Sequence, residues 1–305
     1  PINLKPVGAG AWRVDEVSLK ESGIVDSYTL KSFRAYPLGE PYIRKMVLRF
    51  YPSEVELLNA YEVGAIDAAS AISPHNIRKV QRQGGEIKKL TLPRVFGIFF
   101  NQNEKSLFVE KEVREALNLA TDKERIIKEV LEGYALEVNS PIPPGVFGAL
   151  EHTEGEFNLE RARAGLEKAG WMKNKETGIY EKIENKKVAK EFSFSISTSN
   201  ASDLVRAADI IKQNWEALGA KVEVLVFETS DLNQNVIRPR RYDALLFGEV
   251  VGRDPDPFAF WHSSQRNDPG LNIALYTNRK ADQALEKARS SFSPEERERQ
   301  YEEFQ

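Results

Sequence analysis

The chain has 305 residues, of which 41% are apolar and 29% are charged, and its formal net charge is −3. This composition is ordinary for a globular protein, and the length allows two compact units. The weak negative charge argues against a nucleic-acid partner. The absence of cysteine excludes disulfides, thiol catalysis and cysteine metal sites. No apolar run approaches the roughly 18–20 residues that a membrane-spanning helix needs.

The first 93 residues alternate between strand and helix patterns, which is typical of an α/β unit. The glycines of 8–18 allow a tight backbone approach at the start of the first strand. Ser73 is a suitable N-cap and Pro74 a suitable first-turn residue for a short helix. We expect strands over 8–18, 24–34, 42–51, 65–69 and 86–92, and helices over 52–63 and from residue 73 onward.

Residues 94–133 carry the clearest pattern in the chain. The segment 94–101 runs apolar and predicts a buried strand. Two helical stripes follow, over 109–120 and 126–131. Asp122 is placed to cap the second helix, and Gly133 is placed to end it.

The remainder predicts a second α/β region. Residues 191–227 read as strand, helix and strand, so two parallel strands joined by a crossover helix are expected. Trp171 and Trp215, like Trp12 before them, are assigned to packing. Further expected elements are helices over 158–170, 229–236, 280–291 and 294–305 (the last capped by Ser293), an exposed hairpin over 173–187, a strand over 242–247 and a loop over 248–265.

Several ordered motifs resemble those of family 5 of the extracellular solute-binding proteins, the oligopeptide- and dipeptide-binding receptors of ABC importers. The main one runs from FFNQN at residue 99 through KEVREALNLATDKERIIKEVLEGYALEVNSPIPPG. ELLNAYEVGAIDAA, RARAGLEKAGW and NRKADQALEKARSSFSPEERERQYEEFQ resemble other parts of the same family. No single tetrapeptide is diagnostic, but the ordered set is.

The resemblance implies an α/β fold like that of periplasmic binding proteins, with two lobes of mixed sheets flanked by helices. A partial first lobe would span 1–95 and the second lobe 96–305, with a hinge strand near 94–101. The chain starts at Pro1 without an initiator Met. Together with the resemblance, this predicts a fragment that lacks the N-terminal part and the C-terminal return.

The implied function is capture of a solute between the two lobes, outside the cytoplasm, for delivery to ABC permease subunits. The solute would be a peptide or an oligosaccharide, within a family that also serves nickel. Contact with a membrane would come only through the permease or a missing anchor. We expect no cofactor and no catalytic residue.

The segment 248–265 is the preferred solute site, because ligands of open α/β sheets bind beyond the carboxyl ends of strands. It mixes an aromatic ring, carboxylates and a cation, which suits a polar and partly apolar solute. An alternative interpretation is that residues 254–257 form a helix-start turn and that Trp261 belongs to the core. The candidate solute contacts are Glu249, Val250, Val251, Arg253, Asp254 and Trp261.

By the resemblance, peptide-binding members place an Asp three residues before the Asp or Glu of an acidic residue–Pro pair, where it holds the peptide's α-ammonium. Here that position is Val251, which cannot neutralise a charge. Glu249 could substitute if it shares a face with Val251. Otherwise larger peptides or sugars are favoured. Phe100 and Asn101 are second-rank candidates, with core packing and turn capping as their alternative roles.

Two other classes of function stay open. An enzyme on a two-lobe scaffold would need paired carboxylates or a nucleophile in the cleft. A receptor that senses a solute would differ only in what its termini join. The sequence has no phosphate-binding loop and no G-x-S-x-G motif. Its three histidines, His75, His152 and His262, have no ligand-spaced partners.

Overall fold

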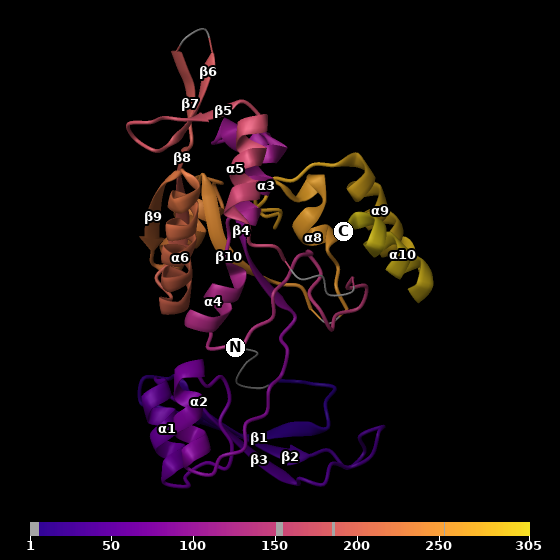
Figure 1. Cartoon of the computed structure of the whole chain (residues 1–305). Coiled ribbons are helices and arrows are strands. Elements are labelled where there is room, and N and C mark those ends of the chain that lie inside the picture. The colour runs from indigo at the N-terminus through magenta and orange to yellow at the C-terminus, as the bar shows by residue number, and fades with distance from the viewer. Residues whose placement is uncertain (1–5, 151–154, 185–186, 253) are drawn as a thin grey trace. The chain divides into compact units, whose positions relative to one another are not determined.

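The computed structural model describes residues 6–150, 155–184, 187–252 and 254–305. The chain divides into two compact units, Pro1–Lys88 and Lys89–Gln305. Figure 1 shows the elements of both units.

The first unit contains an antiparallel sheet in the order β1-β2-β3. Tyr28 of the central strand lies opposite Val17 on one side and Leu48 on the other. Ser53 caps the first helix by accepting a hydrogen bond from the Glu56 amide. The elements are β1 (Trp12–Leu19), β2 (Val25–Ser32), β3 (Lys45–Arg49), α1 (Glu54–Glu62) and α2 (Pro74–Arg82).

Two predictions for residues 65–92 need correction. The strands expected over 65–69 and 86–92 are wrong, since both segments are irregular. Both are fully described and neither joins any of the three sheets. A short apolar run becomes a strand only when a neighbour supplies hydrogen bonds. Ser73 occupies the N-cap position of α2 and Pro74 its first turn, as predicted, but the Ser73 hydroxyl donates to the Glu54 carboxylate at 2.6 Å and makes no capping hydrogen bond.

The second unit is built on a mixed four-stranded sheet in the order β4-β10-β8-β9. β8 and β9 are parallel and are joined by α6, which confirms the predicted strand–helix–strand unit. β10 runs parallel to β8 and antiparallel to β4. The elements are β4 (Arg94–Phe100), β8 (Ser193–Ser199), α6 (Ser202–Leu218), β9 (Lys221–Phe227) and β10 (Ala244–Val250).

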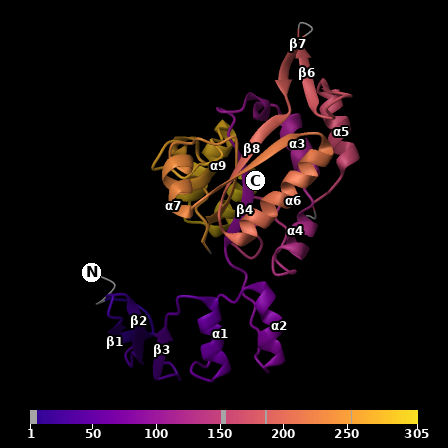
Figure 2. The ribbon, with the colours of Figure 1, turned by 90° about the vertical axis from the view of Figure 1, so that its left-hand side faces the viewer.

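Each face of this sheet has its own hydrophobic core. One face carries Ala244 and Leu246 and packs under α3, α5 and α6 with Phe108 and Trp215. The other face carries Leu245 and packs with Leu232, Trp261 and their neighbours. Figure 2 shows α3 and α6 on one side of the sheet and α7 and α9 on the other. The helices are α3 (Lys111–Leu119), α5 (Leu159–Lys168), α7 (Thr229–Asp231) with the π-helix Leu232–Ile237, α8 (Phe258–Trp261) and α9 (Arg279–Ser290).

Three helix termini have the predicted capping residues. Asp122 accepts a hydrogen bond from the Arg125 amide at 2.9 Å and caps α4 (Lys123–Glu129). Ser293 caps α10 (Pro294–Phe304) in the same way. Gly219 is the C-cap of α6 and has a φ of +121°. Left-handed φ values favour glycine, which explains why glycine ends this helix. The prediction that Gly133 ends α4 is wrong: that helix ends at Glu129 with Val130 as its C-cap, and Gly133 lies in the turn that follows, with a φ of +80°.

The predicted hairpin is part of a small antiparallel sheet that projects from the second unit (Figures 1 and 2). It consists of β5 (Trp171–Lys173), β6 (Tyr180–Glu184) and β7 (Lys187–Glu191). Glu110, at the start of α3, binds it. The carboxylate accepts hydrogen bonds from Trp171 Nε1 at 3.0 Å, Lys182 Nζ at 3.1 Å and Lys190 Nζ at 2.7 Å. Burial acts to raise the pKa of Glu110, but these three donors outweigh it and lower the pKa below its ordinary value.

Substitution of Glu110 by alanine should lower the free energy of unfolding by about 2–3 kcal/mol, because two lysines and an indole N–H lose their shared acceptor. Glu110→Gln retains one acceptor oxygen and should cost roughly half as much. Urea unfolding of both variants measures the difference. Equal stability of wild type and Glu110→Ala would show that the bridge contributes nothing to folding.

Candidate functional site

The proposed site begins at the end of β10, which is longer than expected. The predicted strand ended at residue 247, but β10 continues to Val250, with Glu249 opposite Val95 of β4. The backbone amide of Val251 then donates to the Pro93 carbonyl at 2.9 Å. Gly248 makes room for Phe96, because a Cβ at this position would lie 2.6 Å from the Phe96 ring.

Side chains alternate across this strand end. Glu249 is 7% exposed and Val251 is 8% exposed, whereas Val250 between them is 69% exposed. Glu249 and Val251 therefore lie on the same, buried side of the backbone. This is the condition under which Glu249 could take the place of an acidic residue at position 251.

The carboxyl group of Glu249 is buried without compensation. Its Oε1 has no hydrogen-bond partner among the described residues. Burial raises the pKa of Glu249 to about 8, so the group is mainly protonated at neutral pH. A buried polar atom left unpaired costs about 1–3 kcal/mol. The carboxyl can relieve that cost by donating a hydrogen bond when protonated or by pairing with a cation when ionised.

The register of β4 and β10 shows which residues share the Glu249 face. Opposite pairs on that face are Glu249 with Val95 and Phe247 with Gly97. Gly97 has open space where a side chain would stand, with no atom within 4 Å of a built Cβ. The face of the sheet that carries Glu249 therefore has open space at Gly97.

Trp261 packs on the same face but farther along the strands. Its ring lies 6.4 Å from that of Phe99, which is opposite Leu245. Leu245 is four residues from Glu249, roughly 13 Å along a strand. The rings of Tyr276 and Phe304 also contact Trp261. Trp261 therefore packs in the core, which was the alternative interpretation of this residue. The structure does not bring it against Glu249.

The acidic residues after β10 are engaged by arginines. Asp254 Oδ1 pairs with Arg297 at 2.5 Å, and Asp256 Oδ2 pairs with Arg289 at 3.1 Å. Pro257 directly precedes α8, as the helix-start interpretation predicted. Arg253, the cation proposed for the site, lies outside the described residues.

The two second-rank candidates have structural partners. Phe100 packs on the opposite sheet face from Glu249, with ring centroids 4.6 Å from Phe108 and 6.1 Å from Trp215. Asn101 is fully buried, and its Nδ2 donates to the Arg240 carbonyl at 2.7 Å. Its Oδ1 accepts from the backbone amides of the turn after β4.

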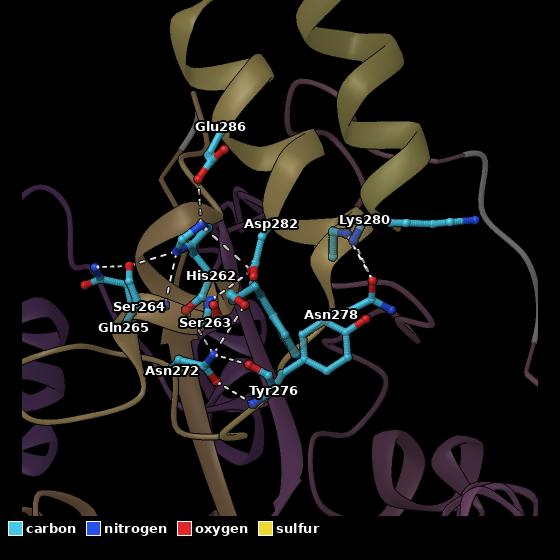
Figure 3. Close-up of polar contacts among 12 residues, drawn as sticks. His262, Ser263, Ser264, Gln265, Asn272, Tyr276, Asn278, Lys280, Asp282 and Glu286 are labelled. Atoms are coloured by element: carbon cyan, nitrogen blue, oxygen red, sulfur yellow. Dashed lines mark hydrogen bonds and ion pairs between the residues drawn. The ribbon is translucent and has the colours of Figure 1, made fainter.

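A polar cluster that sequence reasoning did not find surrounds the end of α8 (Figure 3). His262 stacks on Phe258 with ring centroids 4.1 Å apart. Buried Asn272 donates through Nδ2 to the carbonyls of Trp261, His262 and Tyr276, which fixes the backbone that carries Trp261. These partners are 4 to 11 residues from Asn272 in sequence and have no periodic spacing, so the sequence offered no signal.

The described part of the chain has neither a membrane-spanning helix nor a cluster of metal-binding side chains. No helix there is both long and apolar enough to cross a membrane. No group of three or more His, Asp or Glu side chains there is arranged to hold a metal ion.

The chain is similar to known proteins over nearly its whole length. The family model of bacterial extracellular solute-binding proteins, family 5 Middle, matches residues 1–271. The oligopeptide-binding protein AppA of Bacillus subtilis is 27% identical over 307 residues, covering 98% of this chain and 54% of AppA. The nickel-binding periplasmic protein of Escherichia coli is 26% identical over 263 residues, covering 85% of this chain and 48% of that protein. The chain thus spans about half the length of these curated relatives.

Solved structures are likewise similar to nearly the whole of this chain, which covers somewhat more than half of each of them. AppA of Bacillus subtilis in complex with a nonapeptide superposes with a TM-score of 0.72 at 24% identity, covering 98% of this chain and 58% of AppA. NikZ of Campylobacter jejuni in complex with Ni(L-His) superposes with a TM-score of 0.75 at 25% identity, covering 99% of this chain and 59% of NikZ. These similarities confirm the predicted α/β fold of the periplasmic-binding-protein type.

Proposed function

The chain belongs to family 5 of the bacterial extracellular solute-binding proteins, and from that membership we propose that it captures a small solute outside the cytoplasm for ABC permease subunits. The family resemblance of its motifs is thereby confirmed. The relatives bear the names of substrate-binding proteins. We assign binding and no catalytic step to this chain.

We propose that the solute contacts Glu249 at the end of β10. The observation that carries this proposal is the buried carboxyl whose Oε1 lacks a hydrogen-bond partner among the described residues. A ligand that supplies a partner recovers the cost of that unpaired atom. Val251, on the same side of the backbone, would contribute apolar contact.

An oligopeptide is the solute that this arrangement favours. The α-ammonium of a peptide can pair with ionised Glu249, and an apolar side chain of the peptide can contact Val251 beside it. The AppA structure that superposes on this chain contains a nonapeptide. An oligosaccharide receives less support, because Trp261 already packs against three aromatic rings instead of offering a free stacking face.

Thermal unfolding of the complete protein with a panel of probes tests the proposal. The probes are a nonapeptide of mixed sequence, the same peptide N-acetylated, maltotetraose and Ni(II)–L-histidine. The unmodified nonapeptide, at about 100 times its Kd, should stabilise the protein by about 2.7 kcal/mol. The acetylated peptide should bind at least tenfold more weakly, because it has no ammonium for Glu249.

The Glu249→Gln variant is the matched control for this experiment. It should bind both peptides with similar affinity, because its amide cannot discriminate an ammonium by charge. A raised midpoint with maltotetraose or Ni(II)–L-histidine alone would contradict the peptide assignment. No shift with any of the four probes would contradict the proposed function itself.

A further inference from the structure

The last two helices of the chain hold the segment that follows β10 and includes α8. In this connecting segment, defined as residues 251–263 without the undescribed residue 253, Asp254 pairs with Arg297 of α10 at 2.5 Å. Asp256 pairs with Arg289 of α9 at 3.1 Å. Between these two carboxylates, the Pro255 carbonyl accepts a hydrogen bond from Tyr301 Oη at 2.8 Å.

The side chains that make these contacts are themselves fixed. Tyr301 is buried in a hydrophobic cluster with Ile142, Val146 and Ala288. Its ring fills the space beside Gly148, where a Cβ would lie 2.5 Å from it. The Arg297 guanidinium lies over the rings of Phe147 and Tyr301, at 5.1 Å and 5.9 Å. Because packing already holds the Arg297 guanidinium in place, its side chain loses little entropy when it pairs with Asp254.

Helix α9 also holds the far end of the connecting segment (Figure 3). The backbone amide of Ser263 donates to Asp282 Oδ1 at 2.9 Å. His262 Nε2 lies 3.3 Å from Glu286 Oε1. The guanidinium of Arg289 lies over Phe258 at 4.5 Å. Contacts from α9 and α10 are therefore spaced along the segment from Asp254 to Ser263.

We propose that α9 and α10 position the solute site, with Arg297, Arg289 and Tyr301 as positioning residues that set the path of the backbone after Glu249 and Val251. This inference rests on the proposed function. Gly252, with φ +76°, is the turn between the site and the ion pairs. Loss of the pairs would let this turn move, and small displacements of a binding group are costly because geometry determines its contact with the ligand.

Reversal of the Asp254–Arg297 charges separates positioning from other roles. Asp254→Arg and Arg297→Asp each replace an attraction by a repulsion, and each should weaken binding of the nonapeptide about fivefold. The double variant restores an opposite-charge pair and should recover most of the wild-type affinity. Titration calorimetry on the complete protein measures each Kd, and thermal unfolding measures stability separately.

The Lys212–Glu216 pair of α6, 3.6 Å apart, provides the control. Lys212→Glu should leave the affinity unchanged. If the wild type binds the nonapeptide and all three reversal variants bind equally well, the positioning role is overturned and the proposed function stands. If both single variants bind weakly and the double variant is not rescued, Asp254 or Arg297 contacts the solute itself, which also overturns positioning. If the wild type binds none of the panel, the proposed function fails and positioning fails with it.

Discussion

Raising the pH from about 4 to about 8 should lower the free energy of unfolding of the wild-type protein by about 4 kcal/mol relative to the Glu249→Gln variant. Burial raises the pKa of Glu249 from 4.5 to about 8 in the folded chain. Between these two values the native state holds a proton that the unfolded state releases. The stabilisation is therefore complete below the unfolded pKa and is lost as the pH rises through the folded pKa.

Urea unfolding of both proteins at a series of pH values measures this difference, because the variant carries every other titrating group. Glu223→Gln is the matched control, since this exposed carboxylate lies on β9 of the same sheet. Its profile should run parallel to that of the wild type. Parallel profiles for wild type and Glu249→Gln would show that Glu249 titrates in the folded protein as it does in water, and the case for a buried, unpaired carboxyl would fall.

The fold could be predicted from the sequence where the hydrophobic pattern and the capping residues of a segment indicate the same element. Asp122 and Gly219 mark helix ends by capping and by left-handed backbone, and both effects depend on a few adjacent residues. The parallel pair β8 and β9 followed from the strand–helix–strand order of residues 191–227. The strands predicted over 65–69 and 86–92 are wrong because a strand needs a partner strand, and adjacent residues do not determine that pairing.

The candidate site could be predicted only in part, because it too depends on contacts between residues that are far apart in the sequence. Glu249 was selected as a carboxylate near a strand end, but its burial depends on β4, more than 140 residues earlier, which extends β10 to Val250. Likewise the pair Asp254–Arg297 joins residues 43 apart in a chain with 89 charged side chains, 43 basic and 46 acidic. Nothing in the sequence distinguishes that pair from the many other combinations of opposite charge.

Trp215→Ala should cause the largest loss of stability among core substitutions in the second unit, about 4–5 kcal/mol. Trp215 of α6 is fully buried, with ring centroids 6.1 Å from Phe100 of β4 and 5.5 Å from Phe194 of β8. Its Nε1 donates to the Leu117 carbonyl at 3.0 Å, which ties α6 to α3. The substitution opens a cavity at the point where the sheet and both helices meet, and it also removes one of the two side-chain hydrogen bonds that the Leu117 carbonyl accepts, the other coming from Thr121 Oγ1.

Trp215→Phe separates these two contributions, because phenylalanine keeps most of the ring volume and loses the N–H donor. It should cost about 1–2 kcal/mol in urea unfolding. Phe292→Ala is the control, since Phe292 between α9 and α10 is completely exposed and should change stability by less than about 0.5 kcal/mol. A Trp215→Phe loss as large as that of Trp215→Ala would mean that the hydrogen bond between α6 and α3, and not the packing of the ring against the sheet, holds this core together.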